Sequence, residues 1–197
     1  MGVLRTPDEA VSISKVLENL RAALDGVGVP YMVTGSLVSS VHGVPRATQD
    51  IDIVVAPTRE QLFALMDYFG EPTYDSDKDD AVDALRRRSM FSVIDRRGIW
   101  KIDFIVRKER PFSYREFGRR QKVEILGLSV YAATPEDMVL AKLEWAKLGE
   151  SERQIKDAAG IIEIQGANLD LNYVERWVAA LAIEDQWNSA QRIAHKS

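Results

Sequence analysis

The sequence predicts an α+β fold, with a mixed α/β sheet in the first two-thirds of the chain and helices alone in the last third. Short apolar runs bounded by turn residues, such as 51–55 and 99–106, indicate strands. From Thr134 onward the apolar residues recur only at helical spacing. We therefore expect a core domain over residues 1–132 and a C-terminal helical subdomain over 133–197 packed on it.

The first half of the chain alternates helices with strands. Thr58 is a helix cap, and Gln61 at the third position completes a capping box. The run 51–55 is almost wholly apolar, which is typical of a central strand. The expected order is a helix over 8–25 that ends at Gly26, a strand over 29–34, the first turns of a helix over 36–41, a strand over 51–55 and a helix over 59–69.

The second half begins with an acidic segment, 72–80, which we expect to be a loop. Pro135 stands at the first position of a helix, where its missing N–H costs nothing. The remaining expected elements are a short helix over 80–87, a hairpin of strands 90–94 and 99–106, a helix over 111–120, a strand-like segment over 122–132, and helices near 135–148, 151–165, 171–182 and 185–195.

Composition narrows the classes of protein that are possible. The 197 residues are 46% hydrophobic, which is enough for a core, and no apolar run reaches the roughly 18–20 residues of a membrane-spanning helix. The chain has no cysteine, so disulfides and thiolate metal sites are excluded. We expect a soluble cytoplasmic protein that does not act at a membrane.

Charge is distributed unevenly along the chain. Residues 86–122 hold 13 Lys and Arg against four acids, a local net charge of +9, which leaves −13 for the rest because the whole chain carries −4. Such a segment can attract a phosphate or a nucleic acid, unless these are ordinary basic residues on solvent-facing strands. The adjacent Arg86, Arg87 and Arg88 are the candidates for binding acceptor phosphates, because we expect that they cannot all pair with nearby acids.

Asp50 and Asp52 begin the expected central strand. Residues i and i+2 of a strand point to the same face, so the two carboxylates converge and repel unless a cation lies between them. Magnesium prefers such oxygen ligands and keeps positions free for water and phosphate. The alternative is a pair of strand-end acids that face solvent.

Asp103 begins a second apolar strand segment, and Gly35-Ser36 joins a strand to a helix. If the strand of Asp103 neighbours 51–55, three carboxylates meet, as a two-metal phosphoryl-transfer site requires. Otherwise Asp103 pairs with one of the arginines around it. At Gly35-Ser36, the N–H groups and dipole of the helix N-terminus favour a phosphate, although such a junction can also be a simple turn and cap.

Together, Gly35-Ser36, Asp50-Ile51-Asp52 and Asp103 resemble the nucleotidyltransferase superfamily, which has the fold of DNA polymerase beta. The segment Arg46-Ala47-Thr48-Gln49-Asp50-Ile51-Asp52 is similar to the R-x-T-x-D-x-D of abortive-infection and mycobacterial nucleotidyltransferase toxins. The resemblance covers roughly residues 28–165. It implies Mg²⁺ or Mn²⁺ as cofactor at Asp50, Asp52 and Asp103, and an NTP such as ATP bound near Gly35, Ser36, Arg46 and Thr48.

That branch of the superfamily also carries a lysine on a C-terminal helix and an aspartate beyond it. Lys142 and Asp157 stand at these places. The resemblance implies that Lys142 binds the triphosphate, and that Asp157 holds this lysine or positions an acceptor hydroxyl. The alternative is that both lie on solvated helix faces. We interpret His42 as structural, and Tyr131 and Trp145 as possible platforms for a base.

The sequence therefore predicts a metal-dependent enzyme that transfers NMP from an NTP to a hydroxyl acceptor. The toxin resemblance and the basic segment favour RNA, such as a tRNA 3′ end, with a cognate antitoxin protein as partner. A small antibiotic-type molecule or a protein side chain is the alternative acceptor. A non-catalytic nucleotide- or RNA-binding module on the same fold is the alternative of another class, and the three intact carboxylates argue against it.

Overall fold

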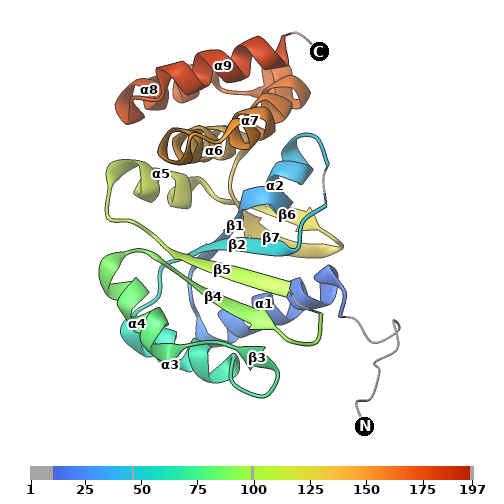
Figure 1. Cartoon of the computed structure of the whole chain (residues 1–197), viewed down its shortest axis with the longest axis vertical. Helices are drawn as coiled ribbons and strands as arrows, with labels where there is room; N and C mark the ends of the chain where they lie inside the picture. The colour runs from blue at the N-terminus through green and yellow to red at the C-terminus, as the bar shows by residue number, and fades with distance from the viewer. Residues whose placement is uncertain (1–10, 46, 99, 196–197) are drawn as a thin grey trace.

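A mixed seven-stranded sheet forms the centre of the computed structural model, which describes residues 11–45, 47–98 and 100–195 (Figure 1). The strands are β1 (Tyr31–Thr34), β2 (Asp50–Val55), β3 (Tyr74–Asp75), β4 (Met90–Asp95), β5 (Trp100–Val106), β6 (Gln121–Ile125) and β7 (Leu128–Ala132). Their order in the sheet is β3-β4-β5-β2-β1-β7-β6. The central strand β2 runs antiparallel to β1 and parallel to β5, which confirms the predicted mixed sheet.

The helices divide between the two sides of the sheet, as Figure 1 shows. On one side lie α1 (Ile13–Val27), α3 (Arg59–Tyr68) and α4 (Lys78–Arg87). The other side carries α2 (Gly35–His42), α5 (Pro111–Arg119), α6 (Pro135–Gly149), α7 (Glu152–Gln165), η2 (Gly166–Asn168), α8 (Leu171–Leu181) and α9 (Glu184–Ala194). Helices α6 and α7 contact α2, so the C-terminal helices stand over the face of the sheet that α2 covers.

The pleat of β2 gives its two faces different chemistry. Ile51 and Ile53 are fully buried in the hydrophobic core, whereas Asp50 and Asp52 point to the opposite face, on which α2 lies. Apolar burial on one side therefore fixes which way the two carboxylates point, since a shift of the register by one residue would expose the isoleucines.

Local signals in the sequence set several element ends. The predicted capping box is present, with Thr58 and Gln61 exchanging side chain–backbone hydrogen bonds at the start of α3. Helix α1 differs from the prediction: Ser12 caps it and it begins at Ile13, while residues 8–10 lie outside the described part of the chain. It ends at Val27 because Gly28 adopts a left-handed conformation and closes the last turn.

The expected loop over 72–80 is partly structured. Tyr74 and Asp75 form the short edge strand β3, paired with β4, and Asp77 caps α4 through two backbone N–H groups. Among the described helices, none is both long enough and apolar enough to cross a bilayer.

Candidate active site

One row of polar side chains crosses four strands of the sheet. Thr34 of β1 lies opposite Asp52 of β2, Asp52 opposite Asp103 of β5, and Asp103 opposite Ser92 of β4. Residues in register on neighbouring strands share a face, so all four side chains point to the side that carries α2. The predicted adjacency of the two aspartate-bearing strands is confirmed.

Gly35 allows α2 to begin directly against Asp52. Its φ of +67° is in the left-handed region that favours glycine, and a Cβ built there would lie 1.8 Å from Asp52 Oδ2. The carboxylate thus fills the space that any other residue would need at position 35. The next residue, Ser36, donates its backbone N–H to the same carboxylate.

Opposing electrostatic effects act on the pKa of Asp52. Burial and the neighbouring carboxylate of Asp103 raise its pKa, and Asp50 adds to this. The N–H of Ser36 and the ammonium of Lys142 act in the opposite direction. The result is a carboxyl whose negative charge is incompletely compensated, beside a cleft.

Asp103 has both carboxylate oxygens engaged. Ser92 Oγ donates to Oδ1 at 2.6 Å, and Lys101 Nζ donates to Oδ2 at 2.8 Å. The pairing with a lysine of its own strand differs from the expected alternative, which was an arginine. Lys101 lies two residues before Asp103, so the two side chains share a face of β5.

A cleft of about 290 Å³ opens over this face between the sheet and helices α6 and α7. Gly35, Ser36, Asp50 and Asp52 line its floor, and Asp50 is exposed to it. The other lining residues are Thr34, Met90, Ile105, Met138, Ala141, Lys142, Trp145, Arg153 and Gln154.

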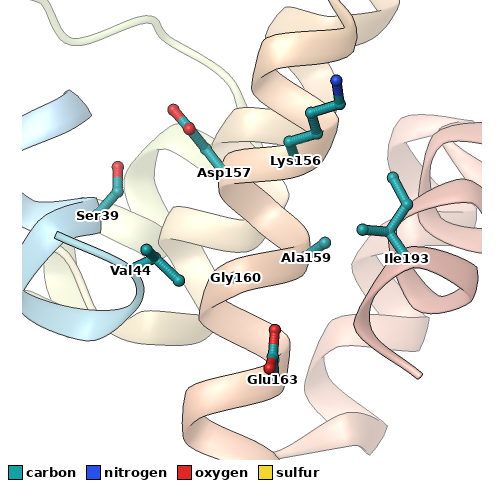
Figure 2. A pocket seen from close by; sticks show the side chains of 8 residues that line it. All are labelled: Ser39, Val44, Lys156, Asp157, Ala159, Gly160, Glu163 and Ile193. Carbon is teal, nitrogen blue, oxygen red and sulfur yellow. The ribbon is translucent and has the colours of Figure 1, made fainter. Parts of the chain in front are cut away.

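Lys142 enters the cleft from α6 and is held by Asp157 of α7, 2.9 Å from Nζ to Oδ2. The lysine side chain is 5% exposed and that of Asp157 13%, so neither lies on a solvated helix face. Asp157 also borders a second cavity, of about 260 Å³, between α2, α7 and α9. Figure 2 shows Asp157 on the side of α7 that faces Ser39, with Lys156 pointing away from it. The ion pair therefore forms part of the wall between the two cavities.

Two residues of the motif precede the aspartates of β2, namely Arg46 and Thr48. Thr48 Oγ1 accepts from the N–H of Asp50 and donates to its carbonyl, at 3.2 and 3.1 Å, so this side chain fixes the start of β2. Arg46 lies outside the described residues.

The three adjacent arginines do not line the cleft. Arg86 and Arg87 both pair with Asp83, at 2.6 and 2.8 Å, and Arg88 pairs with Glu109. As expected, acids close in the sequence do not pair with all three, but none is left unpaired, because Glu109 approaches Arg88 from 21 positions further along the chain. Within the described part of the chain, eight of the 13 basic residues of 86–122 are in ion pairs: Arg86, Arg87, Arg88, Arg96, Arg97, Lys101, Arg110 and Arg119.

The two aromatic residues that the sequence offers as platforms for a base differ in their position relative to the cleft. Trp145 is 49% exposed and lines the cleft, whereas Tyr131 packs edge-on against Tyr31 with ring centroids 5.9 Å apart. His42 is buried and donates Nε2–H to the carbonyl of Ala133 at 2.9 Å, and burial lowers its pKa. These contacts agree with a structural role for His42.

A smaller cavity of about 70 Å³ adjoins the cleft and shares Thr34, Ile105, Ala141 and Trp145 with it. Glu116 of α5 and Glu144 of α6 line this extension. Arg110 pairs with Glu144. Burial, followed by the negative charge of Asp137, raises the pKa of Glu116 to about 8.

Sequence patterns did not point to Lys101, Ser92 or Arg153. The spacing of Lys101 from Asp103 was the available signal, since i and i+2 share a face in any strand. Ser92 and Arg153 had none, because their positions depend on the β4–β5 register and on how α7 packs against α6.

The chain has the nucleotidyltransferase fold, as the sequence predicted. It is similar to the solution structure of the antibiotic-resistance factor ANT(2'')-Ia, with 16% identity and a TM-score of 0.52 over 92% of this chain and 96% of that one. It is also similar to the crystal structure of ANT(2'')-Ia in complex with adenylyl-2''-tobramycin, with 16% identity and a TM-score of 0.54 over 85% and 95%.

A third similar structure is an antigenic nucleotidyltransferase-like protein from Paracoccidioides brasiliensis, with 14% identity and a TM-score of 0.47 over 94% of each chain. No protein-family model and no curated protein sequence matches the chain. At 16% identity, the likeness to the two ANT(2'')-Ia structures establishes the fold alone.

Proposed function

We propose that this protein is a metal-dependent nucleotidyltransferase that transfers the NMP of an NTP to a hydroxyl group of a small molecule. The observation that carries the proposal is the pairing of Asp52 with Asp103 across β2 and β5, directly beneath the N-terminus of α2. Carboxylates on the floor of a cleft and a helix N-terminus above them suit a substrate that brings both metal and phosphate.

The donor set fits a hard divalent cation such as Mg²⁺ or Mn²⁺. Asp50, Asp52 and Asp103 offer only carboxylate oxygens, which such ions prefer. Burial first, and then the repulsion from Asp103 and Asp50, raises the pKa of Asp52, and both effects favour binding a cation between the carboxylates. When bound, the ion would neutralise phosphate charge and lower the barrier to attack on phosphorus.

The protein's own groups have defined tasks in the proposed reaction. The acceptor oxygen forms a bond to the α-phosphorus, the bond from that phosphorus to the bridging oxygen breaks, and pyrophosphate leaves. Asp103 takes the proton of the attacking hydroxyl. Lys142, fixed by Asp157, and Arg153 at the rim stabilise the negative charge on the phosphates.

The base of the nucleotide would stack on Trp145. This side chain is half exposed and stands on the same face of α6 as Lys142 and Ala141, which also line the cleft. A rigid aromatic surface next to a phosphate-binding lysine suits a nucleotide, whose base and triphosphate lie at opposite ends.

One structural feature favours a small acceptor over RNA. Eight of the 13 basic residues of 86–122 are held in ion pairs, so the segment offers a phosphate backbone less free positive charge than its sequence indicates. ANT(2'')-Ia, which shares the fold, has been crystallised with an adenylylated antibiotic.

The test is transfer of label from α-labelled ATP, with Mg²⁺ or Mn²⁺, to tobramycin as a small hydroxylated probe or to total tRNA. Metal-dependent pyrophosphate release with labelling of tobramycin is expected. Labelling of tRNA alone would replace the small acceptor with RNA and support a toxin with a cognate antitoxin. No metal-dependent release of pyrophosphate with any of the four NTPs would indicate a non-catalytic binding module.

The triple variant Arg86→Ala/Arg87→Ala/Arg88→Ala provides the matched control. With a small acceptor, its transfer rate should equal that of the wild type and should change little between low and moderate salt. With an RNA acceptor, each lost phosphate contact would reduce the salt dependence by about 0.7–0.9 log units per log unit of salt.

A further inference from the structure

Lys101 lies on the strand face that carries the three carboxylates. The β2–β5 register pairs Asp50 with Lys101 and Asp52 with Asp103. Since residues two apart on a strand point the same way, these four side chains form a compact square on the face beneath α2. The square holds three negative charges and one positive charge.

Contacts and exposure show how the ammonium sits in this square. Its Nζ lies 2.8 Å from Asp103 Oδ2, and its pKa is raised by that hydrogen bond first and by the charges of Asp103, Asp50 and Asp52 after it. The side chain of Lys101 is 44% exposed, against 8% for Asp103. The lysine therefore reaches the carboxylate from the solvent-exposed start of β5 and can swing away without disturbing the core.

We propose that Lys101 is a built-in counterion of Asp103, which occupies the place of a divalent cation in the nucleotide-free protein and moves to a phosphate of the incoming NTP when the cation binds. This inference rests on the metal-dependent transfer proposed above. Lys101 acts through Asp103 and the phosphates, so it is a positioning residue whose first measurable effect is on metal affinity.

Lys101 has to move before Asp103 can bind a cation, because both oxygens of the Asp103 carboxylate already accept hydrogen bonds. One of its oxygens accepts from Ser92 and the other from Lys101. Ser92 is neutral and can stay when the carboxylate binds a metal, but an ammonium and a divalent ion on one carboxylate repel each other. Among the described residues, no group of three His, Cys, Asp or Glu side chains is arranged to hold a metal ion.

The exchange would couple metal binding to arrival of the nucleotide. Without NTP, a divalent ion has to displace Lys101 into solvent. Its affinity is lowered by the free energy that is needed to separate Lys101 from Asp103. With NTP, the displaced ammonium gains a phosphate oxygen as its new partner, and the same ion binds more tightly.

The experiment compares Mn²⁺ affinity of the wild type, Lys101→Met and Lys15→Met, without nucleotide, by electron paramagnetic resonance of the free ion. Lys15→Met is the matched control, because Lys15 pairs with Glu18 at 2.7 Å on the exposed surface of α1. We expect Lys101→Met to bind Mn²⁺ at least about tenfold more tightly than the wild type, because the competing charge is gone. Lys15→Met should match the wild type.

A second readout is the melting temperature in EDTA, which should fall for Lys101→Met and hold for Lys101→Arg, since only the former leaves three carboxylates uncompensated. If Lys101→Met fails to fold, Lys101→Gln repeats the comparison with a neutral hydrogen-bond donor. Equal or weaker Mn²⁺ affinity in the neutral variant, or no binding in any variant, would overturn the proposal.

The two proposals fail in distinguishable ways. If the wild type transfers NMP with Mn²⁺ while Lys101→Met binds the ion no better, only the counterion role is lost. If Lys101→Met binds Mn²⁺ tightly but no NTP is turned over, the counterion role stands and the proposed function is lost.

Discussion

This protein has two acidic clusters, one under the cleft and one under α8, which differ in how completely their negative charge is compensated by hydrogen-bond donors and cations. The cleft cluster consists of Asp50, Asp52 and Asp103, of which Asp50 is exposed. The buried cluster consists of Glu136 and Asp137 at the start of α6, and Asp137 is fully inaccessible to solvent.

Every carboxylate oxygen of the buried cluster has a donor. Asp137 accepts from Tyr173 at 2.6 Å, from Thr134 at 2.8 Å and from Arg119 at 3.1 Å. Glu136 accepts from Arg119 at 2.9 Å and from the N–H of Asp170 at 3.2 Å. The donors come from α5, the start of α6 and α8, so the cluster ties three helices together.

The charge of the cleft cluster is less fully compensated: Lys101 pairs with Asp103 at 2.8 Å, and the pKa of Asp52 is raised although the N–H of Ser36 and the ammonium of Lys142 act against this. Satisfied charges hold helices in place, whereas undercompensated charges beside a cleft attract a ligand that completes them. The same residue type therefore serves the structure in one place and the proposed chemistry in the other.

The largest expected effect comes from Asp52→Asn. We expect NMP transfer to fall by about a thousandfold or more, because a metal-binding charge is lost at the reacting phosphate. The melting temperature in EDTA should stay level or rise, since the raised pKa of Asp52 means that its charge is unfavourable in the folded state at neutral pH. Transfer within tenfold of the wild type would contradict the assignment of the cleft.

Asp137→Asn should show the reverse pattern. It removes a fully buried charge from three donors and leaves Arg119 underpaired, so the free energy of unfolding should fall by about 3 kcal/mol or more. Mn²⁺ affinity, measured at a temperature where the variant is folded, should not change. Urea denaturation of the two Asn variants side by side checks the contrast, and a loss at Asp137 under about 1 kcal/mol would refute it.

Glu116→Gln should give an effect on stability that depends on pH and is small in acid. The folded pKa of about 8 exceeds the ordinary value of 4.5, so the folded state keeps a proton that the unfolded chain loses between these values. The contribution of Glu116 to stability is therefore greatest below pH 4.5 and falls as the pH rises towards 8.

Gln cannot ionise, so the melting temperature of Glu116→Gln relative to the wild type should increase between pH 5 and pH 9. Thermal melts across this range provide the measurement. Parallel curves for the two proteins would show that Glu116 is ionised in the fold and accessible to solvent.

Much of the local structure could be predicted because its causes are local. The capping box of Thr58 and Gln61 and the Pro135 helix start involve residues within one turn of helix. The pairing of Arg88 with Glu109 and the β3 strand could not be predicted, because their partners lie about 20 positions away and meet only in the folded sheet.

The sequence by itself determined the mixed α+β fold and the shared face of Asp50 and Asp52, since apolar burial and the two-residue period of a strand decide both. Only the tertiary structure decided that Asp103 lies opposite Asp52, that Lys101 lies opposite Asp50, and that the Asp52 carboxylate occupies the space beside Gly35. The first two contacts depend on the register between β2 and β5, some 50 residues apart in the chain, and the third on the pairing of β1 with β2; packing of the whole sheet against its helices fixes both.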